Sequence, residues 1–270
     1  MSRFVCVTCG VQYEESGDRP PEHCAICEDQ RQYLPEGGQR WITTERFRDG
    51  HHNELRPQED RLVGIGTSPT FAIGQRALLV QSPGGNVLWD CITHLDEPTE
   101  RGVRELGGIA AIAISHPHYY SAVVDWADAF EARVYLHVGD RQWLMRGSPR
   151  VTFWEGDELE LHDGLRLVNA RGHFDGGTVL HVPFLAAGRG ALLTGDIIQV
   201  IPDKRFVSFM YSYPNLIPLP ASAINRIESM VVGLEFDRIY GAWWDRLIAT
   251  GAKDVVIRSA ERYRRSISDA

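Results

Sequence analysis

The most constraining stretch of this 270-residue chain is an apolar run that ends in two histidines, Ile112-Ala113-Ile114-Ser115-His116-Pro117-His118. Apolar residues fill every position from Ile109 to Ile114, which predicts a buried strand in a sheet covered on both faces. Pro117 favours an extended His116, and side chains two apart in an extended chain point the same way. Both imidazoles are therefore expected to converge on one metal, zinc or iron. Two solvent-facing loop histidines are the alternative, and this stretch alone leaves both interpretations open.

The overall composition limits the classes of partner. The net charge is −8, the pI is about 5.7, and 43% of the residues are hydrophobic. This balance allows a large core and disfavours nucleic acid or an anionic membrane as a partner. The chain lacks the eighteen consecutive apolar residues of a membrane span, and its first residues do not resemble a signal peptide. We expect a cytoplasmic protein; a homo-oligomer stays open.

Four of the five cysteines lie within the first 27 residues, as two Cys-x-x-Cys pairs: Cys6, Cys9, Cys24 and Cys27. Each pair suits a tight turn that aims two thiolates at one ion, and two such turns complete a tetrahedron. Two disulfides are the alternative, and a cytoplasmic setting argues against them. The pattern predicts one structural zinc. Cys91, in the apolar run Val87 to Ile92, is expected to be buried and inert.

The cysteine segment is expected to form a domain of its own. Residues 1–40 contain few aliphatic side chains, too few for a core without a metal, and Gly37-Gly38 predicts a hinge. The domains are therefore predicted as a zinc ribbon over 1–40 and a larger unit over 41–270. Cys-x-x-Cys-Gly10 and Tyr13 make the segment similar to rubredoxin, an iron electron carrier. The loop between the pairs is short and the aromatic core is absent, which favours a structural zinc ribbon.

Short strands and helices alternate after residue 70. Periodicity predicts a helix over Thr99–Leu106 and another that carries Val123, Ala127 and Phe130 on one face. Two later helices are expected over Ala221–Gly233 and Lys253–Ser266, and a charged helical piece over Trp41–His52. Strands are expected at Phe71–Ile73, Ala77–Val80, Asn86–Asp90, Val134–His137, Glu158–Leu161, Leu165–Val168, Thr178–Val182, Ala191–Thr194 and Arg238–Tyr240.

Three motifs stand in order where predicted strands end: His116-Pro117-His118, Gly172-His173-Phe174-Asp175-Gly176 and Gly195-Asp196. Asp90, after Leu88-Trp89, matches a fourth position. In this order the motifs resemble the metallo-β-lactamase superfamily, over about residues 60 to 245. The resemblance implies an α+β fold, a four-layer αββα sandwich with the metal at one edge of its two sheets.

The chain departs from that family at the second metal site. Tyr120 and Ser121 stand where the family has Asp and His, and Tyr240–Trp244 occupies the region of a late histidine. The resemblance therefore implies one metal, zinc or iron, with an open position for water, and a degenerate second site. Its implied ligands are His116, His118, His173 and Asp196.

Further roles follow from the resemblance. Asp196 and Tyr120 are the expected catalytic residues, with Tyr120 as a hydrogen-bond donor to an oxyanion. Asp90, His94 and Asp175 are candidates to support the ligands, Asp175 by orienting His173. The implied function is a metal-dependent hydrolase of a small ester, lactone or thioester. The alternatives are a catalytically degenerate binding or interaction module and a mononuclear iron oxygenase.

Overall fold

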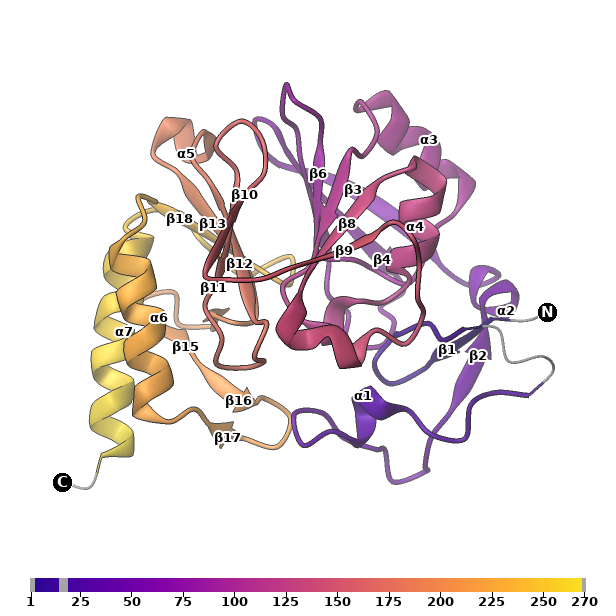
Figure 1. Ribbon diagram of the computed structural model, residues 1–270, viewed down its shortest axis with the longest axis horizontal. Coiled ribbons are helices and arrows are strands. Elements are labelled where there is room, and N and C mark those ends of the chain that lie inside the picture. Colours follow the sequence, from indigo (N-terminus) through magenta and orange to yellow (C-terminus); the bar gives the residue numbers. More distant parts are fainter. Residues whose placement is uncertain (1–2, 15–18, 269–270) are drawn as a thin grey trace.

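The computed structural model describes residues 3–14 and 19–268, and two mixed sheets pack face to face in it (Figure 1). The first sheet has the order β3 (His52–Glu59), β4 (Leu62–Ser68), β5 (Ala77–Val80), β6 (Val87–Trp89), β7 (Ala111–Ala113), β8 (Arg133–His137), β9 (Val151–Trp154). The second has the order β10 (Glu158–Glu160), β11 (Arg166–Asn169), β12 (Thr178–Val182), β13 (Ala191–Gly195), β18 (Arg238–Gly241), β19 (Leu247–Ile248).

Helices cover the outer face of each sheet (Figure 1). Helices α3 (Glu97–Glu105) and α4 (Val123–Phe130) lie on the first sheet, and α6 (Ala221–Val232) and α7 (Ala252–Ile267) lie on the second. The remaining short elements are η1 (Pro117–Tyr119), η2 (Val138–Trp143), α5 (Leu185–Gly188), β14 (Gln199–Val200), β15 (Val207–Ser208), β16 (Met210–Ser212) and β17 (Ile217–Pro218). This arrangement confirms the predicted αββα sandwich. Within the described ranges, no helix is long and apolar enough to cross a membrane.

The core explains why the central strands are apolar at every position. Along β5, Leu78 points between the sheets, where it shares a cluster with Leu180 and Leu193 of the second sheet. The next residue, Leu79, points outward into the cluster beneath α3 and α4. Because successive side chains of a strand alternate in direction, a strand buried on both faces needs apolar residues on both.

Strands β3 and β4 were not predicted from the sequence, although they pair over most of their length. Strand β3 reads His-Asn-Glu-Leu-Arg-Pro-Gln-Glu, with little apolar alternation. It pairs on one side only, and such an edge strand tolerates polar residues and a proline such as Pro57. The strand expected at Phe71–Ile73 is instead a turn, with Ala72 at a positive φ.

The cysteine segment forms a small two-stranded unit docked at the end of the sandwich (Figure 1). Strand β1 (Phe4–Cys6) pairs with β2 (Trp41–Thr43); of the second cysteine pair, Cys24 precedes α1 (Ala25–Glu28) as its N-cap and Cys27 lies within it. Residues Trp41–Thr43, just past the expected boundary at residue 40, therefore pair with the cysteine segment. Helix α2 (Thr44–Arg48) follows β2, so the helix expected over Trp41–His52 is shorter than predicted.

Candidate metal centres

The four ribbon cysteines form the first cluster. All four are buried and free of disulfides. The Sγ atoms of Cys6 and Cys27 lie 3.5 Å apart, and those of Cys9 and Cys24 lie 3.7 Å apart. A tetrahedral ion with metal–sulfur bonds of about 2.3 Å would separate its sulfurs by about 3.8 Å. Gly10, at φ +79°, allows the turn after the first pair. The cluster therefore fits the predicted tetrahedral metal site.

The second cluster consists of His116, His118 and His173, whose ligand atoms all lie within 4.8 Å of one another. His116 is extended, as predicted, but His118 belongs to the 3-10 turn η1. The two imidazoles therefore converge, with ring centroids 5.0 Å apart, through a turn and not through an extended chain. His173 arrives from the loop after β11 in the other sheet.

The hydrogen bonds of these imidazoles leave nitrogens free for a metal. His173 Nδ1 donates to the carbonyls of Met210 and Tyr211, at 3.2 and 2.8 Å, so its Nε2 carries a lone pair. That Nε2 lies 3.3 Å from His118 Nδ1. A tetrahedral metal with bonds of about 2.0–2.1 Å would place two nitrogens about 3.3 Å apart.

Burial also favours neutral imidazoles. The three histidine residues are at most 4% exposed. Burial lowers the pKa of His173 to about 4, partly offset by the carbonyl of Tyr211. Burial, followed by neighbouring His173, lowers the pKa of His116 and of His118 well below the usual range. Neutral imidazole is the form that ligates a metal, so the site is prepared for one.

Asp196 completes the predicted ligand set. Its Oδ1 lies 3.2 Å from His116 Nε2, at the end of β13. Within residues 3–14 and 19–268, neither atom has a hydrogen-bond partner of acceptable geometry, although both are buried. Burial raises the pKa of Asp196 to about 7. Buried polar atoms are nearly always satisfied in native proteins, so these two unpartnered atoms fit the role of metal ligands.

Asp90 supports the site from the end of β6. Its Oδ1 accepts a hydrogen bond from the Ser115 amide at 2.8 Å, and Ser115 Oγ lies 2.9 Å from His116 Nδ1. Burial raises the pKa of Asp90 to about 7, against the opposing effect of the Ser115 amide. Gly195, at φ +55°, passes close by: a Cβ there would lie 2.5 Å from Ser115 Oγ. Asp90 thus holds the segment that carries His116.

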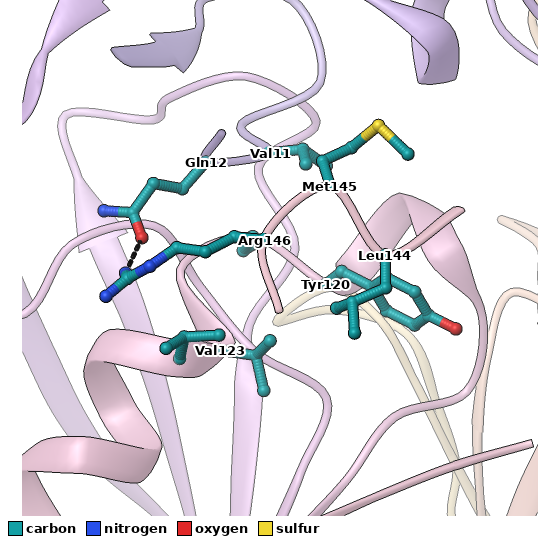
Figure 2. A pocket seen from close by; sticks show the side chains of 9 residues that line it. Val11, Gln12, Tyr120, Val123, Leu144, Met145 and Arg146 are labelled. Carbon is teal, nitrogen blue, oxygen red and sulfur yellow. Dashed lines mark hydrogen bonds between the residues drawn. The ribbon is translucent and has the colours of Figure 1, made fainter. Parts of the chain in front are cut away.

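The tyrosine beside Asp196 is Tyr119, which the sequence analysis missed. The centroid of its ring lies 4.4 Å from that of His116, and its hydroxyl is buried. Burial raises the pKa of Tyr119 well above its usual value, and the negative charge of Asp196 raises it further. Tyr120 instead lines a cavity of about 10 Å³ with Val11 and Leu144 (Figure 2). The signal was available: proline at the first position of a 3-10 turn brings residues three apart into register, so Tyr119 falls over His116.

The structure places the other sequence candidates away from the imidazoles. His94 Nε2 lies 3.1 Å from Asp96, and its ring packs on Phe47. Asp175 is exposed, and the carbonyls described above orient His173 in its stead. Ser121 is tied into the scaffold, since its Oγ accepts a hydrogen bond from Gln75 at 3.0 Å.

Three comparisons place this geometry among known proteins. The model of the metallo-beta-lactamase superfamily matches residues 72–252. The chain is 49% identical, over 99% of its own length and 98% of the relative's, to uncharacterized protein YmaE of Bacillus subtilis (strain 168). Among solved structures, VMB-1 superposes with a TM-score of 0.60 at 11% identity, over 80% of this chain and 99% of that chain.

The metallo-beta-lactamase DIM-1 superposes with a TM-score of 0.57 at 15% identity, over 78% of this chain and 98% of that chain. These structural likenesses concern the fold. The family match covers both histidine segments, Asp196 and every strand of the two sheets except β3 and β4. With its αββα layers and three converging imidazoles at the edge of the sheets, the chain belongs to the metallo-beta-lactamase superfamily.

Proposed function

We propose that the protein is a hydrolase that uses one metal ion in the sandwich domain and cleaves a small ester, lactone or thioester. The observation that carries the proposal is the set of buried ligand atoms at metal-ligand spacing: His116 Nε2 and Asp196 Oδ1 are 3.2 Å apart and lack hydrogen-bond partners in the described chain, and His118 Nδ1 lies 3.3 Å from His173 Nε2. A divalent metal bound there would supply an activated water nucleophile near neutral pH.

The chain's own residues supply ligands and proton handling. His116, His118, His173 and Asp196 would hold the metal, and Asp90 fixes the backbone of the loop that carries the first two. The Tyr119 hydroxyl, beside the Asp196 carboxylate, is placed to hold a proton or to donate to an oxyanion. A site of four thiolates suits zinc in the ribbon, and free thiols agree with a cytoplasmic setting.

The first test is the metal content per chain after zinc saturation and gel filtration. Two zinc ions per chain are expected, one at the cysteines and one at the histidines. His116→Ala should remove one zinc and abolish hydrolysis of a panel of esters, lactones and thioesters. Three zinc ions would overturn the single-metal site. A single zinc ion per chain that His116→Ala retains would favour a non-catalytic binding module. Oxygen consumption by an iron-loaded form would favour an oxygenase.

A further inference from the structure

The ribbon is docked against the loops that form the histidine site. The backbone N–H of Gln12 donates to the Ser121 carbonyl at 3.0 Å, just after the His116–His118 turn. Thr93 Oγ1 donates to the Gly10 carbonyl at 2.8 Å, and Trp143 packs against the cysteine cluster. Several contacts from different loops therefore hold the ribbon in one position.

One ribbon residue, Arg31, reaches the histidine site itself. Its Nη1 donates to the His173 carbonyl at 3.4 Å. Its guanidinium lies 3.9 Å from the centroid of the Phe174 ring. Phe174 in turn lies close to all three imidazoles, with centroid distances of 5.5 Å to His116, 4.9 Å to His118 and 5.1 Å to His173. Arg31 thus packs on the aromatic ring that lies against all three imidazoles.

Arg31 is fixed by the residues that follow the second cysteine pair. The Asp29 carboxylate accepts from Arg31 Nε at 2.6 Å, Nη2 at 2.9 Å and the Arg31 amide at 2.9 Å. Asn215 Nδ2 donates to the carbonyls on either side, those of Gln30 and Gln32, both at 2.9 Å. The path from Cys27 to His173 therefore runs through a short stretch of ribbon backbone and one clamped side chain.

We propose that Arg31 is a positioning residue of the histidine metal site, and that through it the occupancy of the cysteine site sets the affinity of the histidine site. This inference rests on the proposed metal at the histidines. Two effects of Arg31 have opposite signs. Its charge repels a cation, whereas its packing on Phe174 and its bond to His173 preorganise the ligands. Asp29 neutralises the charge, so positioning dominates.

The test measures the affinity of the histidine site with cobalt(II) and with zinc in competition with a chelator. The absorption bands of a thiolate site and of a nitrogen–oxygen site differ, so each site is followed separately. Arg31→Ala should weaken the histidine site about 10- to 100-fold, the usual effect of removing an outer support of a ligand. Arg31→Lys keeps the charge, loses the planar fork, and should fall between. Arg40→Ala, an exposed ribbon arginine, is the matched control and should change nothing.

Coupling is tested with Cys24→Ser, which is expected to lose the ribbon metal. That variant should weaken the histidine site at least as much as Arg31→Ala, and adding Arg31→Ala to it should have little further effect. Tighter or unchanged cobalt binding in Arg31→Ala overturns the positioning role. Full affinity in a ribbon emptied of metal overturns the coupling. If the wild type binds no metal at the histidines, the proposed function itself has failed, which is a separate result.

Discussion

Removing the buried hydroxyl of Tyr119 should affect stability and activity differently. Because no hydrogen bond of acceptable geometry satisfies the buried hydroxyl in the described chain, Tyr119→Phe should leave the free energy of unfolding unchanged or raise it, by up to about 1 kcal/mol. If the hydroxyl acts on a proton or an oxyanion, the same change should lower kcat by about 100-fold. Urea unfolding and steady-state kinetics check both parts. Tyr120→Phe is the comparison: a loss of kcat there alone would return the role to Tyr120.

The buried carboxyl of Asp140, which is not one of the proposed metal ligands, should make the stability of the fold depend on pH. It is buried, and its Oδ1 accepts from the Gly176 amide at 2.9 Å. Burial raises its pKa to about 7; the Gly176 amide and Arg31 oppose the rise, and Asp175 adds to it. A carboxyl with a raised pKa in the folded state stabilises most below its unfolded pKa near 3.8, and this contribution is lost as pH rises towards 7.

The comparison of wild type with Asp140→Asn isolates that effect. Relative to the variant, the wild type should lose up to about 4 kcal/mol of unfolding free energy between about pH 4 and pH 7. Denaturant unfolding across this range gives the difference. Parallel pH profiles for the two proteins would mean that Asp140 ionises freely in the folded state.

At the scale of elements, the ribbon depends on its cysteines. Strands β1 and β2 are three residues each, and α1 has four, so the unit has little secondary structure of its own. Structural zinc contributes folding free energy directly in such units. Cys24→Ser should therefore release one zinc and make the ribbon sensitive to protease, while the sandwich stays folded. Zinc analysis and limited proteolysis measure this, and an unchanged zinc content would contradict the assignment. Cys91→Ser, outside the cluster, is the control.

The elements also show what sequence can predict. Strands such as β5 and β12 and helices α6 and α7 were expected within one or two residues, because their apolar periodicity is strong. The ligands His116, His118 and His173 follow from short motifs at strand ends. Arg31 and the edge strand β3 were missed for a shared reason. An edge strand gains its partner, and Arg31 its stacking ring, from residues distant in sequence, and neither leaves a local pattern.

At the scale of the whole molecule, the histidine site joins the two sheets. His116 and His118 follow β7 of the first sheet, whereas His173 and Asp196 follow β11 and β13 of the second. A bound metal stabilises only the folded state, in proportion to RT ln(1 + [L]/Kd), about 4 kcal/mol at roughly a thousandfold excess over Kd. Zinc should therefore raise the melting temperature of the wild type, and His116→Ala should abolish the part that belongs to this site.

The same placement has a consequence for amide hydrogen exchange. An ion shared by both sheets adds a cross-link between segments that side-chain packing and a few hydrogen bonds already join, such as the bond from the Thr178 amide to the Ser115 carbonyl at 2.8 Å. Filling the site should slow exchange in β7 and β13 together, because neither strand can open without breaking a metal bond. Protection confined to one sheet would show that the ligands of the other sheet are not engaged. If the ion joins both sheets, metal starvation weakens the cohesion between the two halves of the sandwich. The inactive protein is then also more easily degraded by proteases.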